Sequence, residues 1–495
     1  MTGRPRRTEG SPASGGPRAG GAAGDAGRRA RPSPRERTAE ATPELDRLLH
    51  ALNDPVPGIR QTAAVALGLL GDGRARGSLL ATLGDPDHGV RAAAVDALGA
   101  LGRPESRPDL ERALADDDAS VRANAAGALG RIADPASVPA LAARRDDPSG
   151  DVRLAVVTAL GRIGDAPALA VLAPCLDDPS DRVRRAAVLA LGRGADAARL
   201  ATIRARLADP ARRVRVAAAV VLGRHRDAVC VPELLEILVR PGTWEKPAVL
   251  VALGQIGAPA SIPAVLAAAE HDASWVRVCA IHALGEMGGA AAADAARRHL
   301  GDAAWSVRGA AAIALGRVGG RDDLPRLVAL LEDGHSWPRR GATYALGELG
   351  LTEAAPRLRE SLADPDAEVR LAAVWSLGHL GDDGARDPLL RMLRDRLAPA
   401  EGAAPAAAPA EAGRLGTDAA SRLFDATVQA LGRVVHGGDP LVARALREAR
   451  ERLSDEELDR PALLPLPELR PGHGMPTVRD LFDGAIPAAA DPDEE

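Results

Sequence analysis

Apolar and polar positions recur along this chain with a fixed period. The stretch 364–382 reads DPDAEVRLAAVWSLGHLGD, and 85–103 reads DPDHGVRAAAVDALGALGR. In the later stretch the apolar or small residues follow one face of a helix with 3.6 residues per turn, at Val369, Ala372, Ala373, Ser376 and Leu377. Asp366 precedes them, as Asp87 and Asp118 do in earlier copies, at the place of a helix N-cap. The pattern predicts a helix in each copy.

A shorter helix is predicted in the other half of each unit. The stretch 385–397 reads ARDPLLRMLRDRL, with one apolar stripe formed by Leu389, Leu390, Leu393 and Leu397. A unit of this size cannot bury two apolar faces alone, but stacked units bury them against one another. The chain is therefore expected to be all-α: an α-solenoid, a superhelical array of about twelve 31-residue helical hairpins.

Three residue types mark the unit. Leu-Gly recurs at intervals of 31 residues, and the glycines are Gly68, Gly99, Gly130, Gly161, Gly192, Gly223, Gly254, Gly285, Gly316, Gly347 and Gly378, with Gly432 after an insertion. Each Gly either ends the tightly packed part of the helix or lets a neighbouring helix approach closely. An Arg lies eight residues before the Gly, replaced once by Lys246, and an Asp lies fourteen before it, replaced by Arg240 and His271.

This pattern resembles the HEAT-like repeats of the phycobilisome-lyase type, typified by DPDxxVRxAAxxALGxxGD. The resemblance covers about 43–382 and resumes near 417–453. In HEAT repeats the Asp and the Arg six residues later form a ladder of hydrogen bonds between neighbouring units. The resemblance therefore implies a ladder through the pairs from Asp54/Arg60 to Asp364/Arg370. The pair Arg240/Lys246 cannot contribute, and Asp272 is a candidate substitute for His271.

The pattern also divides the chain. We expect a disordered basic N-terminal segment (1–42), the repeat array (43–397), an Ala/Pro-rich insertion (398–416), a last repeat with a capping helix (417–453) and an acidic Pro-rich tail (454–495). The tail has eleven acidic residues against three Arg. Its stretch 477–487, TVRDLFDGAIP, is expected either to form a short docking helix or to pack over the last repeat.

Composition narrows the class of protein only a little. Aromatic residues are rare, with five Trp, one Tyr and two Phe, so small aliphatic side chains must fill the core. Cys175, Cys230 and Cys279 lie far apart, which argues against a disulfide framework or a zinc site and fits a reducing cytoplasm. The sequence has no apolar run of membrane-spanning length and no signal-peptide pattern. We therefore expect a cytoplasmic protein.

Binding residues are expected on the second helix of each unit, which lines the concave face in HEAT proteins. The positions seven and three before the Gly and one after it form a row that should face outward. In repeats three to six this row carries an Arg, and we name this set the basic ridge: Arg131, Arg162, Arg193 and Arg224. Such a ridge could meet phosphates or an acidic partner, or could be a solvated face.

A second candidate lies in repeats seven to eleven, which hold every Trp and the only Tyr. We name the aromatic patch by its members: Trp244, Trp275, Trp305, Trp337, Ile313, Tyr344 and Trp375. Arg317, Arg340 and His379 lie among them as a possible polar rim. Exposed aromatic clusters mark protein-binding sites, so a partner site is predicted here. The alternative is that the Trp rings fill gaps left by the altered ladder.

Catalytic and metal chemistry has little support. His282 with Glu286, Glu348 and His379 are the possible ligands, but His282 and His379 are three units apart. HEAT-like deoxyhypusine hydroxylases bind iron through His-Glu pairs, and this chain has no His-Glu dipeptide. The leading expectation is a non-catalytic scaffold for protein partners, without metal, cofactor or membrane contact. The alternatives are nucleic-acid or polyanion binding along the basic ridge, as in HEAT-like alkylpurine DNA glycosylases, and a bilin lyase-like activity implied by the family name.

Overall fold

The computed structural model describes residues 43–240, 244–397, 422–431, 433 and 440–452. These residues form α-helices joined by turns and short 3-10 helices, with no strand among them. The predicted all-α array of helical hairpins is confirmed. The expectations for 1–42, for the insertion 398–416 and for the tail 454–495 lie outside the described residues, as does part of 417–453. The chain divides into two compact units between Arg103 and Pro104, although the 31-residue spacing continues across that point.

The first unit contains two hairpins. Its helices are α1 (Pro43–Ala51), α2 (Pro57–Leu70), α3 (Arg76–Thr82) and α4 (His88–Leu101). The second helices α2 and α4 pack against each other, while α1 packs on α2 and α3 on α4. Each hairpin thus buries its apolar faces partly within itself and partly against its neighbour.

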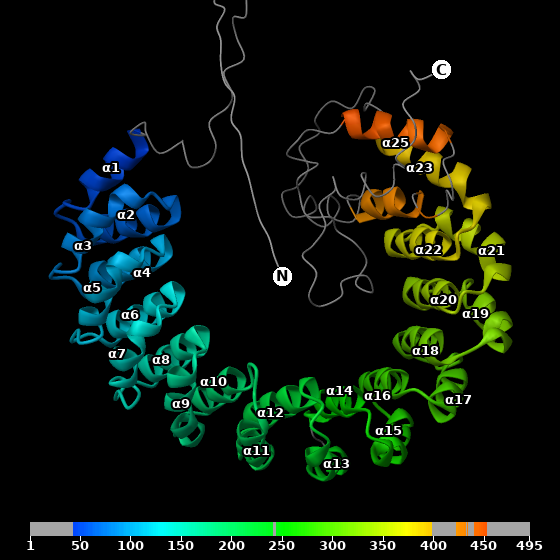
Figure 1. Cartoon of the computed structure of the whole chain (residues 1–495), viewed down its shortest axis with the longest axis horizontal. Helices are drawn as coiled ribbons and strands as arrows, with labels where there is room; N and C mark the ends of the chain where they lie inside the picture. Colours follow the sequence, from blue (N-terminus) through cyan, green and yellow to red (C-terminus); the bar gives the residue numbers. More distant parts are fainter. Residues whose placement is uncertain (1–42, 241–243, 398–421, 432, 434–439, 453–495) are drawn as a thin grey trace, which may run out of the picture. The chain divides into compact units, whose positions relative to one another are not determined.

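The second unit repeats this arrangement in two layers, which Figure 1 shows from cyan to orange. Its first helices are α5 (Arg107–Ala113), α7 (Val138–Ala142), α9 (Ala166–Leu172), α11 (Ala197–Arg204), α13 (Val231–Val239), α15 (Ile262–Ala269), α17 (Ala290–His299), α19 (Leu324–Leu330), α21 (Ala355–Glu360) and α23 (Arg386–Leu397). Its second helices are α6 (Ala119–Ile132), α8 (Gly150–Ile163), α10 (Asp181–Leu191), α12 (Arg212–Arg224), α14 (Lys246–Ile256), α16 (Ser274–Met287), α18 (Trp305–Val318), α20 (Ser336–Glu348) and α22 (Ala367–Leu380). A helix over 422–431 follows the insertion, and α25 (Pro440–Arg452) packs on α23.

The helix boundaries follow from the sequence signals. The Asp366 carboxylate accepts hydrogen bonds from the amides of Glu368 and Val369 (2.9 and 3.2 Å), which caps the start of α22. Asp87 and Asp118 cap α4 and α6 in the same way. The predicted core positions of α22 are buried, as are Leu389, Leu390 and Leu393 of α23. The side chain of Leu397 lies outside the described residues.

The recurring Gly serves close helix approach. A Cβ built on Gly130 would lie 2.7 Å from the Cα of Ala159 in the next second helix. Equivalent short contacts join Gly347 to Ser376 and, across the insertion, Gly378 to Ala430. Of the two readings offered by the sequence, close approach is the correct one, because any larger residue would push adjacent second helices apart.

The ladder exists, but its pairing differs from the expected one. The Arg side chain donates to the backbone carbonyl of the Asp six residues earlier, as Arg308 does to Asp302 (2.9 Å). Its remaining N–H groups form a two-point bond, at 2.7–3.1 Å, with the carboxylate 25 residues later, in the next repeat. These bonds join Arg60 to Asp85, Arg122 to Asp147, Arg153 to Asp178, Arg184 to Asp209, Arg277 to Asp302, Arg308 to Asp333 and Arg339 to Asp364.

Candidate protein-binding site

The regular Arg–Asp pairing of the ladder is interrupted at the repeats where the aromatic residues begin. Arg215 bonds the buried carboxylate of Glu245, with Nε 2.9 Å from the nearer oxygen, in place of an Asp at position 240. One step later, the two ladder positions hold Lys246 and His271, which are both basic and cannot form an ion pair with each other. Arg277 bonds the backbone carbonyls of His271 and Asp272, and among the described residues no ion pair joins the Asp272 carboxylate to Lys246 or to Arg277, so Asp272 does not replace the ladder Asp. The joint between repeats seven and eight therefore lacks an Arg–carboxylate bond.

A pair of indole rings spans this joint. Trp244, just before α14, stacks on Trp275 at the start of α16, with ring centroids 5.6 Å apart and planes 5° apart. The two rings thus make a contact across the joint that lacks the ladder bond. Yet 69% of Trp244 and 40% of Trp275 remain exposed to solvent. Stacking thus uses one face of each ring and leaves the other surfaces available.

Two further indoles begin the next second helices. Trp305, 47% exposed, opens α18 and stacks on His335, with centroids 5.7 Å apart. Trp337, 36% exposed, lies near the start of α20 against Gly309 of α18, which has no Cβ to obstruct the ring. The Arg340 guanidinium carbon sits 5.1 Å from the Trp337 ring centroid. We name these four indoles the tryptophan row: Trp244, Trp275, Trp305 and Trp337.

Trp375 is not part of an exposed surface, and the expectation that it faces outward is wrong. It is 6% exposed, and two rings stack on it. The Tyr344 centroid lies 4.8 Å away on α20, and the His379 centroid lies 5.1 Å away on α22 itself. Tyr344 is half-buried, and burial together with the Glu348 carboxylate raises its pKa to about 12. This stack belongs to the packing between α20 and α22, and only His379 is exposed.

The remaining members of the patch lie on the second-helix layer. Ile313 of α18 is half-buried, and Arg317 forms an ion pair with Glu286 of α16. Arg340 lies 3.5 Å from the Glu368 carboxylate. Among the described residues, no three His, Cys, Asp or Glu side chains gather as metal ligands. The structure does not bring His282 and His379 into contact; they lie on α16 and α22.

The basic ridge is exposed along its whole length, on α6, α8, α12 and at the end of α10. Arg193 donates to the carbonyl of Gly161 in the preceding repeat (2.9 Å), which satisfies an unpaired carbonyl at the end of α8. In the described chain, Arg162, Arg193 and Arg224 form no ion pair with an acidic side chain.

Three residues that shape the site were missed by sequence reasoning. Glu245 takes the place of the ladder Asp, and its signal was an acid directly before Lys246. Gly309 makes room for Trp337, and its signal was a Gly seven residues before Gly316, where other repeats carry a side chain. His335 stacks on Trp305, and nothing in its spacing marked it.

Comparisons with known proteins agree on the fold. A family model for HEAT repeats matches the chain seven times, at residues 45–123, 110–192, 172–246, 200–278, 231–316, 274–347 and 325–408. A search of curated proteins finds no significant match. Within the described residues, no helix is long and apolar enough to cross a membrane.

Solved structures with stacked helical hairpins are similar to this one. The karyopherin Kap121p bound to the extreme C-terminus of the protein phosphatase Cdc14p has 14% identity and a TM-score of 0.56, covering 85% of this chain and 56% of that one. The Kap95:Nup1 complex has 13% identity and a TM-score of 0.51, covering 90% and 67%. The CpcE–CpcF phycocyanin lyase of Nostoc has 25% identity over 50% of this chain and 96% of that one, but a TM-score of only 0.31. The family matches span most of the sequence, and the chain belongs to the HEAT-repeat family.

Proposed function

We propose that this protein is a non-catalytic scaffold that binds protein partners along its second-helix layer, with the tryptophan row as the main contact. The observation that carries the proposal is the exposure of four indoles on consecutive repeats, from 36% at Trp337 to 69% at Trp244. Exposed Trp side chains are costly to hydrate and are enriched among residues that dominate binding energy.

The surroundings of the row suit a peptide or protein surface. Each ring is braced by a neighbour: Trp244 by Trp275, Trp305 by His335, and Trp337 by Arg340. Braced rings lose little side-chain entropy on binding, which favours affinity. Ile313 on α18 adds a half-buried apolar side chain, and Val251 on α14 adds an exposed one.

Two structures of similar fold are complexes with a partner. The Kap121p structure holds the C-terminal end of a protein phosphatase, and Kap95 is in complex with Nup1. At such low sequence identity, these neighbours support only the statement that a fold of this kind can bind protein partners. A bilin lyase activity has no comparable support, because the phycocyanin lyase overlaps at a TM-score of 0.31.

The test is a selection with the full-length protein as bait. A displayed library of random peptides should yield binders whose contacts map to α14, α16, α18 and α20 by hydrogen exchange. Failure to select any peptide, or binders that protect only other helices, would count against the proposal.

A further inference from the structure

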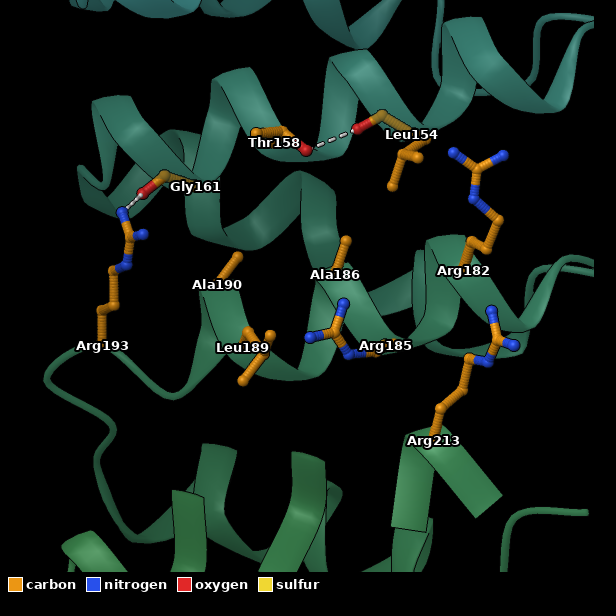
Figure 2. Close-up of a pocket in the computed structure, with 10 residues that line it drawn as sticks. All are labelled: Leu154, Thr158, Gly161, Arg182, Arg185, Ala186, Leu189, Ala190, Arg193 and Arg213. Atoms are coloured by element: carbon orange, nitrogen blue, oxygen red, sulfur yellow. Dashed lines mark hydrogen bonds between the residues drawn. The ribbon is translucent and has the colours of Figure 1, made fainter. Parts of the chain in front are cut away.

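A shallow pocket of about 390 Å³ lies on the second-helix layer, between α8, α10 and α12 (Figure 2). Its floor is apolar: Leu154 comes from α8, and Ala186, Leu189 and Ala190 come from α10. Figure 2 shows Arg193 at one end of this floor, Arg182 and Arg213 at the other, and Arg185 between them beside Leu189. We name this site the arginine pocket, and its charged members are Arg182, Arg185, Arg193 and Arg213.

Positive charge around the pocket is only partly neutralised. Arg182 pairs with Asp151 (3.0 Å) and Arg213 with Asp181 (3.0 Å), both at exposed positions where ion pairs contribute little and exchange easily. In the described chain, five arginines between 182 and 226 form no ion pair: Arg185, Arg193, Arg212, Arg224 and Arg226. Of these five, only Arg185 and Arg193 line the pocket, and they give it positive charge that attracts carboxylates or phosphates.

The apolar floor decides which anion fits better. A phosphodiester backbone would pair with the arginines but leave Leu154 and Leu189 exposed beneath it. A peptide that carries an apolar side chain between two carboxylates would fill the floor and pair with the rim together. The pocket is thus matched to an acidic peptide with a central aromatic or aliphatic residue.

The chain itself contains such a peptide. Residues 480–483 read Asp-Leu-Phe-Asp, in a tail of 42 residues that has eleven acids against three Arg. Leu481 and Phe482 offer the apolar side chains, and Asp480 and Asp483 flank them. Other segments place a Leu between two acids, such as Glu457-Leu458-Asp459 in the same tail, but 480–483 is the one that places a Phe between two acids.

The tail is long enough to reach the pocket. Asp480 follows Arg452, the last residue of α25, by 28 residues, which span up to about 90 Å when extended. Seven repeats separate the pocket from the helix over 422–431, and packed helices are about 10 Å apart, so the path along the second-helix layer is roughly 70 Å.

We propose that the tail segment around Asp480–Asp483 binds in the arginine pocket of the same molecule. The Phe482 ring lies on the floor formed by Leu189 and its neighbours, and the two carboxylates pair with Arg185 and Arg193. The chain's own tail then covers the most basic part of the basic ridge. This inference does not depend on the tryptophan row.

The single lysine of the chain, Lys246, makes a direct test possible. The full-length variant Arg185→Lys keeps the charge and places one amine in the pocket. A carbodiimide, which joins an amine to a carboxylate without a spacer, should link position 185 to Asp480 or Asp483, as read by mass spectrometry. The yield should not change on dilution, because the link is intramolecular. Phe482→Ala in the same protein should remove the link, although both carboxylates remain.

Two control variants, each with one new lysine elsewhere on the chain, show whether the tail lies at another place. Arg131→Lys on α6 controls for non-specific contact with a distant Arg of the ridge. Arg391→Lys on α23 reports a tail packed over the last repeat. Links from position 391 or 131 instead of 185, links only between two molecules, or links that survive Phe482→Ala would each overturn the proposal. A further outcome would also overturn the proposal. If no link forms, and the protein binds a single-stranded oligonucleotide that the double variant Arg185→Ala with Arg193→Ala no longer binds, the pocket is a nucleic-acid site.

Discussion

The indole of Trp337 occupies the space that Gly309 leaves by having no Cβ. The two residues lie on adjacent second helices, α20 and α18, and the Arg340 guanidinium lies over the same ring, with its carbon 5.1 Å from the centroid. Gly309 therefore packs against the tryptophan row and is not simply a flexible position in α18. It fixes one indole at the surface in a defined orientation.

Gly309→Ala should displace the Trp337 ring. The added methyl overlaps the indole, so the ring must turn outward, while the helix gains about 1 kcal/mol of propensity. We expect a red shift of Trp emission with little net change in the free energy of unfolding. In a Trp337→Ala background the same change should be stabilising by about 1 kcal/mol. An unaltered emission spectrum, or equal effects in both backgrounds, would mean that the two residues are not coupled.

Arg308→Ala should lower the free energy of unfolding by about 2 kcal/mol. The substitution leaves the Asp333 carboxylate, which is mostly buried, without its two-point partner, and it also removes the bond to the Asp302 carbonyl. Urea denaturation followed by circular dichroism measures the loss. Arg391→Ala, at an exposed position of α23, should change stability by less than about 0.5 kcal/mol. Equal effects of the two substitutions would make Arg308 an ordinary surface residue.

The ladder also predicts loss of stability in acid. The Arg308 guanidinium holds the pKa of Asp333 below its usual value, and Arg60 does the same for Asp85. A depressed carboxyl pKa stabilises the fold above the unfolded value near 4, and this contribution is lost as pH falls through the folded pKa. The urea midpoint should be level near neutral pH and fall below about pH 4. In Arg308→Ala the fall should be shallower; an identical slope would exclude the Arg308–Asp333 bond as a cause.

Trp375→Ala should destabilise the protein by about 3 kcal/mol, because it empties a buried site between Tyr344 and His379. Trp305→Ala, at a 47% exposed position, should cost less than about 1 kcal/mol. Thermal melting of the two variants compares a packed ring with a surface ring. A small effect of Trp375→Ala would contradict the buried stack and return Trp375 to the surface candidates.

Much of the fold follows from local sequence. The spacing of Val369, Ala372 and Leu377 predicts α22, and Asp366 predicts its start, because caps and apolar faces depend on residues within one helix. The 31-residue period predicts stacking, since every unit presents the same faces to the next. The structure bears out these local features.

Contacts between repeats are harder to predict. The spacing of six residues pointed to Asp302 and Arg308, but Arg308 bonds only the backbone carbonyl of Asp302. Its ion pair is with Asp333 of the next repeat, and the Asp302 carboxylate pairs with Arg277 of the preceding one. The burial of Trp375 depends on Tyr344, which is 31 residues away, and on the orientation of both rings. Predicting such contacts requires knowledge of how two neighbouring helices are aligned along their axes. The residue pattern within a single repeat does not give this alignment.

The affinity of a library-selected peptide for matched surface variants tests the central claim most directly. Trp244→Ala with Trp305→Ala removes the two most exposed members of the tryptophan row, and Val229→Ala with Val239→Ala removes exposed apolar side chains of the first-helix layer. One hot-spot truncation costs about 2 kcal/mol or more, so the Trp pair should weaken binding by at least about 30-fold, with a nearly unchanged melting temperature. The Val pair should bind like the parent. Unchanged affinity of the Trp pair, or an equal loss in the Val pair, would contradict the account.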